Sequence, residues 1–97
     1  MSTNKRERPK IEGGNMVRFE AKSEGARITM KGTGTIHAYV GTDGVNYKEV
    51  DHNESFNQDG VAVFPIACFI GDCIKFTATT ITSVEINWSI VNGSERG

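Results

Sequence analysis

Apolar and polar residues alternate with a period of two along most of this 97-residue chain. Val17, Phe19 and Ala21 fall on one side of an extended segment, and Arg18 and Glu20 fall on the other. This pattern is typical of a β-strand with one face buried and the other in solvent. No segment carries a 3.6-residue period long enough to predict a helix. We therefore expect an all-β protein.

The alternation returns at a regular spacing of roughly 8–12 residues, which is typical of sandwiches and related folds. Turn residues separate the segments, and the Asp43-Gly44 pair predicts a hairpin with a type I′ turn. Pro65 lacks an amide proton, so its strand should lie at a sheet edge or carry a bulge. We predict an antiparallel β-sandwich or a jelly-roll-like fold of about seven strands.

The first 14 residues differ from the rest in charge. Residues 1–14 carry a net charge of +2 and residues 15–91 a net charge of −3. The sequence predicts a flexible N-terminal arm over residues 1–14, a sandwich domain over 15–91 and a short polar tail over 92–97. Deleting the arm should then leave the fold intact. The basic residues expected to attach the arm to a partner are Lys5, Arg6, Arg8 and Lys10.

Catalytic chemistry has little support in the sequence. His37 and His52 are the only histidines, and neither lies in a recognisable catalytic context. We expect a protein that is not an enzyme and that needs no cofactor and no metal. Calcium at one of the acidic loops, 42–44 or 51–54, is a weaker alternative, because turn chemistry alone explains them. No glycine-rich phosphate loop is present, and we expect neither nucleic acid nor membrane as a partner.

Residues 1–8 are polar and lack the apolar core of a signal peptide. The sequence thus predicts synthesis in a cytoplasm without export. Cys68 and Cys73 are then expected to be buried free thiols. A disulfide across the turn between them is the alternative, since the two residues flank it.

Residues 61–69 form a nearly continuous apolar run. Such a run is buried on both faces of a sheet, or is buried on one face and covered by a partner on the other. A small domain cannot easily bury it alone, so we expect an oligomer interface here. The residues assigned to that interface are Val61, Val63, Phe64, Ile66 and Phe69.

Two tyrosines suggest an alternative function. Tyr39 lies on the polar face of its predicted strand beside His37, and Tyr47 follows the Asp43-Gly44 turn. Exposed aromatic rings on a β-sandwich are how carbohydrate-binding modules stack sugars. His37, Tyr39 and Tyr47 therefore form the predicted glycan-binding face.

The stretch from Thr35 to Val50, with Thr42-Asp43-Gly44, Asn46-Tyr47 and Glu49-Val50, resembles a hairpin found in discoidin-like and carbohydrate-binding modules. It is also similar to a hairpin of short virion proteins of tailed bacteriophages. In those proteins it is followed by a polar turn ending in Asp-Gly, an apolar strand and a last pair of strands rich in Thr and Val. Residues 59–91 follow that order.

The resemblance covers about residues 16–91 and implies a capsid decoration, head-fibre or small tail protein. It implies a structural role in the virion and self-association, often as a trimer. It also implies attachment to a major capsid protein or another virion protein through the N-terminal arm. Host-surface glycan is a further partner that a head fibre can have.

Overall fold

The structure, a computed structural model, describes residues 5–89, apart from the side chains of residues 5 and 51–53. The predicted tail, 92–97, lies outside the described residues. Between residues 5 and 89 there is no helix, and hence none long and apolar enough to cross a membrane. Nine strands are described: β1 (Lys5–Glu7), β2 (Ile11–Glu12), β3 (Met16–Glu20), β4 (Gly25–Thr33), β5 (Thr35–Gly41), β6 (Lys48–Ser55), β7 (Val61–Ala67), β8 (Cys73–Thr77) and β9 (Thr80–Trp88).

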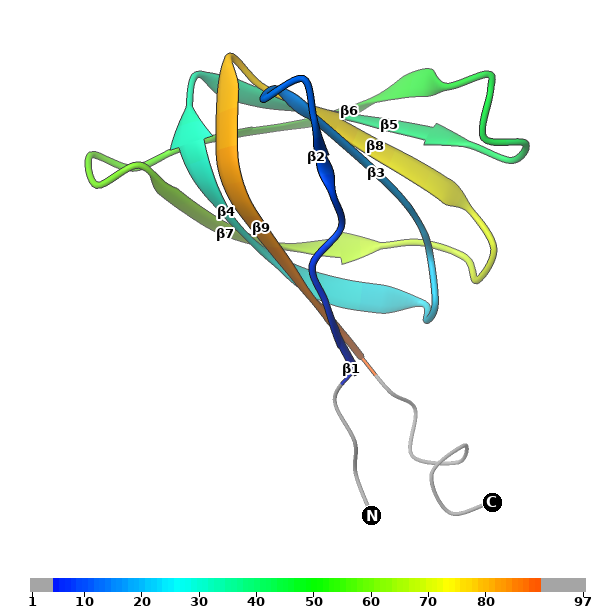
Figure 1. The fold of residues 1–97 in the computed structure, drawn as a ribbon. Coiled ribbons are helices and arrows are strands. Elements are labelled where there is room, and N and C mark those ends of the chain that lie inside the picture. The colour runs from blue at the N-terminus through cyan, green and yellow to red at the C-terminus, as the bar shows by residue number, and fades with distance from the viewer. Residues whose placement is uncertain (1–4, 90–97) are drawn as a thin grey trace.

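These strands form two antiparallel sheets that pack face to face as a β-sandwich (Figure 1). The four-stranded sheet has the order β1-β9-β4-β7, and the five-stranded sheet has the order β2-β3-β8-β5-β6. The predicted all-β sandwich is therefore confirmed. The strand number differs from the expected seven because residues 5–12 add β1 and β2.

The core lies between the sheets and follows the predicted alternation. Val17 and Phe19 on β3 are buried, while Arg18 and Glu20 face solvent. Four aromatic side chains form a chain across the core. The rings of Trp88 and Phe19 lie 5.8 Å apart, those of Phe19 and Phe76 5.7 Å, and those of Phe76 and Phe64 5.6 Å. Trp88 and Phe64 belong to one sheet and Phe19 and Phe76 to the other, so these contacts join the two layers.

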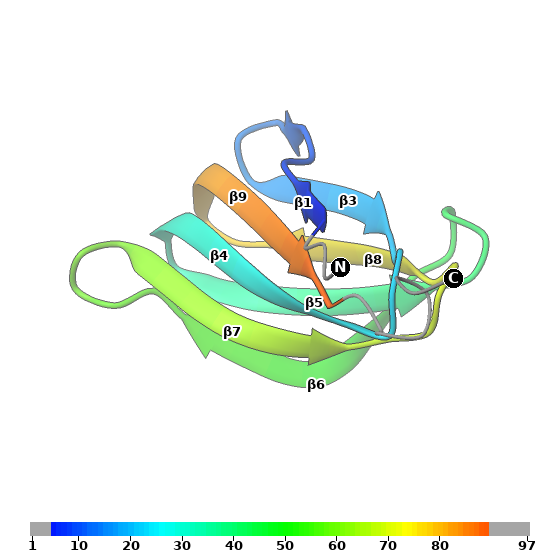
Figure 2. The same cartoon turned by 90° about the horizontal axis from the view of Figure 1, so that it is seen from below.

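The N-terminal segment is part of the sandwich, which corrects the prediction of a flexible arm for its described residues. β1 pairs with β9 in one sheet, and β2 pairs with β3 in the other. Residues 8–10 carry the chain between the two sheets, and Figure 2 shows β1 on the side of the sandwich where β9 and β3 lie. Strands that switch sheets in this way close a sandwich at its corner.

A buried indole explains why this segment docks. Trp88 is 1% exposed, and its ring N–H donates a hydrogen bond to Glu7 Oε1 at 3.0 Å. A buried indole N–H without an acceptor would be costly, and Glu7 supplies the acceptor. Lys22 Nζ lies 3.4 Å from the same carboxylate oxygen. Further along, Arg18 donates two hydrogen bonds, of 2.8 and 2.6 Å, to Glu12 and so ties β2 to β3.

The opposite side of the sandwich is bordered by the edge strands β6 and β7. These strands belong to different sheets and lie next to each other without pairing (Figure 2). Pro65 lies on β7, which is an edge strand of its sheet. A residue without an amide proton is tolerated there, so the predicted edge position of Pro65 is confirmed. The sandwich is thus closed by the chain itself on one side and left without a covering strand on the other.

The hydrogen bond from Trp88 to Glu7 predicts a stability effect. Glu7→Leu leaves the indole N–H without its acceptor and should lower the free energy of unfolding by about 1–3 kcal/mol. Glu7→Gln retains an acceptor oxygen and loses only the partly exposed ion pair with Lys22, so it should cost about 0–1 kcal/mol. Urea denaturation followed by tryptophan fluorescence measures both. Glu20→Leu on the solvent face of β3 is the control, and an equal loss in all three variants would contradict this role of Glu7.

Candidate functional site

An apolar groove opens between β6 and β7. It consists of two adjoining hollows that share Val40, Val50 and Ala67 as lining residues. The deeper hollow has a volume of about 210 Å³ and reaches Phe76 in the core. The outer hollow is bordered by Cys68 and Phe69. We call this feature the β6–β7 groove; its other lining residues are Ala38, Pro65, Ile66 and Ile74 in the deeper hollow and Glu24 and Asp72 in the outer one.

Two large apolar side chains stand in solvent in the turn between β7 and β8. Phe69 is 75% exposed and Ile70 is 69% exposed. The backbone of this turn is held firmly. The Phe69 amide donates to Asp72 Oδ2 at 3.0 Å, and the backbone atoms of Gly71 and Asp72 bond to those of Ala21. The turn therefore presents two apolar side chains on an ordered backbone, at the border of the β6–β7 groove.

The five residues predicted as an oligomer interface do not share one surface. Phe64 is 2% exposed and packs in the core, so its assignment to an interface is corrected. Val61 and Val63 lie on the outer face of the four-stranded sheet, and only Ile66 and Phe69 line the β6–β7 groove. The run splits because β7 is an ordinary alternating strand whose outward residues also happen to be apolar.

Ile70 was missed by the sequence reasoning. Ile70 lies in the turn between Cys68 and Cys73, and turn residues are usually exposed and polar. Two consecutive large apolar residues before Gly71-Asp72 are unusual for a turn, and that is the signal that identifies them.

Both cysteines are free thiols. Cys68 Sγ donates a hydrogen bond to the backbone oxygen of Ser23 at 3.3 Å. Burial raises the pKa of the Cys68 thiol, and the nearby carboxylates of Asp72 and Glu24 raise it further. A raised pKa disfavours the reactive thiolate at neutral pH, so Cys68 is suited to packing more than to chemistry.

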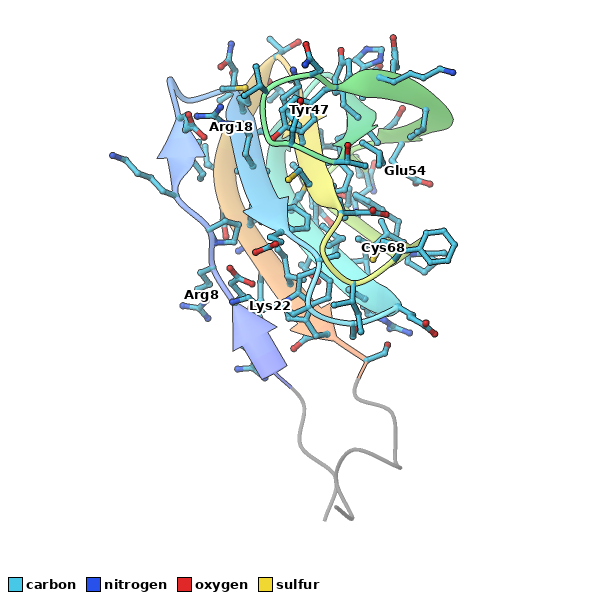
Figure 3. All side chains as sticks on the ribbon, turned by 90° about the vertical axis from the view of Figure 1, so that its right-hand side faces the viewer. Arg8, Arg18, Lys22, Tyr47, Glu54 and Cys68 are labelled. Atoms are coloured by element: carbon cyan, nitrogen blue, oxygen red, sulfur yellow. The ribbon has the colours of Figure 1, made fainter. Side chains whose placement is uncertain are left out.

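The structure brings Tyr39 and Tyr47 together around a lysine. Lys75 Nζ lies 4.5 Å from the centre of the Tyr39 ring and 4.8 Å from that of Tyr47. Tyr47 also lines a shallow hollow with Arg18, and the two labelled side chains lie close together in Figure 3. The sequence reasoning missed Lys75, although it lies opposite Tyr39 on the neighbouring strand. Because the ammonium group covers a face of each ring, a sugar could stack there only after Lys75 moved.

His37, the third residue of the predicted glycan face, is paired elsewhere. Its Nδ1 lies 3.1 Å from Glu49 Oε2 on the outer face of the five-stranded sheet. The side chain of His52 does not belong to the described part of the structure. Among the described side chains, no group of three His, Cys, Asp or Glu residues is placed to hold a metal ion.

The loop between β5 and β6 departs from the predicted type I′ turn. In such a turn both central residues have positive φ, whereas here only Gly44 does, at 76°. Asp43 instead accepts hydrogen bonds through Oδ1 from the amides of Val45 and Asn46, at 2.9 and 2.8 Å. These bonds favour a longer loop, residues 42–47, and they lower the pKa of Asp43 from 3.8 to about 2.

This lowered pKa predicts a pH dependence for the loop. A carboxyl group whose pKa is lower in the folded state contributes stability above its unfolded value, and loses it as pH falls through the folded value. The loop should therefore stay ordered down to about pH 4 and loosen between about pH 4 and pH 2. NMR titration of the Val45 and Asn46 amides measures this. Asp43→Asn should abolish the transition, and amides that titrate at the ordinary aspartate pKa would contradict the assignment.

Comparison of the chain with protein-family models, with curated proteins and with solved structures gives no match.

Proposed function

We propose that this chain is a non-enzymatic structural protein of a bacteriophage virion, a capsid decoration or head-fibre component, which works by self-association and attachment to the particle. The observation that carries the proposal is the pair Phe69 and Ile70, held in solvent on an ordered turn beside an apolar groove. The setting in a virion comes from the resemblance of residues 16–91 to small virion proteins of tailed phages.

The exposed pair supports self-association on energetic grounds. Fully burying a side chain such as Phe or Ile contributes about 1.5–3 kcal/mol. Residues that dominate binding are commonly aromatic anchors that fill pockets near the centre of an interface. Hydrogen bonds hold the backbone of the turn before binding, so less backbone entropy is lost when Phe69 and Ile70 dock.

The groove supplies the matching receptor. Its deeper hollow of about 210 Å³ is lined mainly by aliphatic side chains and by Phe76. A dry apolar cavity of roughly 150 Å³ accommodates benzene, so a phenyl ring fits a hollow of this size. We therefore assign the groove of one copy as the site for Phe69 of the next. The expected number of copies comes from the resemblance to small virion proteins, which implies self-association often as a trimer, and a closed ring of three copies is the assembly we propose.

Carbohydrate binding, the alternative function, has less support. Tyr39 and Tyr47 do lie close together, but Lys75 covers a face of both rings, and His37 is paired with Glu49. Sugar stacking needs a free aromatic face.

The proposal predicts the solution mass. Static light scattering at micromolar concentration should give about three times the 10.6 kDa of the chain. Phe69→Asp places a charge in the apolar contact and should reduce the particle to a monomer, with the circular dichroism spectrum unchanged because Phe69 packs little against its own chain.

Val45→Asp is the matched control. Val45 is 78% exposed in the loop between β5 and β6 and does not line the groove, so this variant should keep the wild-type mass. A monomeric wild-type protein would overturn the proposed self-association. Equal dissociation by the two variants would show that Phe69 has no special role.

A further inference from the structure

The outer face of the four-stranded sheet concentrates positive charge. Strand register gives the arrangement: Arg27 on β4 lies between Asn87 on β9 and Pro65 on β7, and Arg6 on β1 lies beside Asn87. Thr29 and Lys31 lie two and four residues after Arg27 on β4, so they lie on the same face of the sheet as Arg27. We call this surface the basic face; its charged residues are Arg6, Arg8, Arg27, Lys31 and Glu85.

The charge balance of this face is opposite to that of the rest of the chain. The basic face holds four of the eleven basic residues and one of the twelve acidic residues. It therefore carries +3, while the remainder of the chain carries −4. Glu85 accepts from Arg6 at 2.8 Å and lies 3.5 Å from Arg8. Among the described side chains, neither Arg27 nor Lys31 has a carboxylate within ion-pair distance, and both are exposed.

From these observations, we infer that the basic face is the surface by which this chain docks on a carboxylate-rich protein surface. The inference rests on the proposed function and names the partner chemistry of its attachment step. It also replaces the flexible basic arm as the attachment device: Arg6 and Arg8 are held on the β1 side of the molecule, where Figure 3 shows Arg8, and they extend a charged surface that β4 continues.

The spacing of the cations favours a macromolecule over a small anion. Arg27 and Lys31 lie four residues apart on one strand, which corresponds to about 13 Å. Arg6 and Arg27 lie two strands apart, which corresponds to about 9.5 Å. One phosphate or one sugar carboxylate cannot contact groups this far apart. Several carboxylates spread over a protein surface can.

The other side chains of this face favour protein over nucleic acid. Its described residues include no aromatic ring on which a base could stack. Along β7 the face is bordered by Val61, Val63 and Pro65, and Val63 is 54% exposed. An apolar border beside a charged area resembles the mixed character of protein interfaces. Charge complementarity across such a surface gives specificity and fast association.

The test uses the full chain and fluorescent poly-L-glutamate, with a DNA duplex of equal charge as the second probe. Fluorescence anisotropy at low salt gives the dissociation constant for each. The wild-type chain should bind poly-L-glutamate more tightly than the duplex. Arg27→Glu with Lys31→Glu should weaken that binding about tenfold or more, because two exposed attractive contacts become repulsive.

The matched control reverses the same amount of charge elsewhere. Lys10→Glu with Lys48→Glu changes two exposed lysines outside the basic face, and binding should stay within about threefold of wild type. Equal weakening by both pairs, tighter binding of the duplex, or absence of binding to poly-L-glutamate would each overturn the inference. Light scattering on the Arg27/Lys31 variant separates this result from self-association: an unchanged mass supports docking on another protein, and an altered mass overturns it.

Discussion

The buried indole of Trp88 is the constraint on which much of this structure depends. Its ring packs against Phe19 across the two sheets, and its N–H must find an acceptor within a core that otherwise consists of apolar side chains. Glu7 is that acceptor, and it can reach the indole only because β1 pairs with β9. One polar atom in the core thus explains why β1 docks on β9, while the Arg18–Glu12 pair holds β2 on β3.

The docking of β1 has consequences on both faces of its sheet. Because side chains alternate along a strand, Glu7 points toward the core while Arg6 lies on the outer face next to Asn87. The same strand therefore stabilises the core and adds positive charge to the surface. The crossing to β2 then closes this side of the sandwich, while the side bordered by β6 and β7 keeps an apolar groove. The molecule has one closed side and one side suited to receiving a second copy.

The sequence predicted the fold class and the inward face of most strands, because one buried face imposes a period of two. It did not predict β1 and β2, because those strands have three and two residues and no apolar alternation. The docking of β1 depends on a contact between residues 81 positions apart, which no local pattern reveals. β2 pairs with the neighbouring β3, but two residues are too few to show a period. The Asp43-Gly44 turn was assigned the wrong type because the Asp43 carboxylate binds two loop amides, and local composition does not reveal that competition.

The site was predicted less well than the fold, for a related reason. The apolar run 61–69 was read as one surface, but alternation sends Phe64 into the core and Val63 to the outer face. The groove itself is formed by β5, β6, β7 and β8 together, so only the tertiary structure brings Val40, Val50 and Ala67 to one place. Phe69 was found from its apolar character alone, and Ile70 was missed beside it.

The central claim is that the N-terminal segment closes one side of the sandwich and that a second copy covers the other side. Native-state hydrogen exchange at low and high protein concentration tests this claim most directly. We predict that amides of β1 facing β9 are protected at both concentrations. We predict that amides of the turn around Phe69 and Ile70 gain protection as concentration rises, because a neighbouring copy then excludes water from them. Exchange of residues 5–12 at the rate of an unstructured peptide, together with a turn that is insensitive to concentration, would contradict the account.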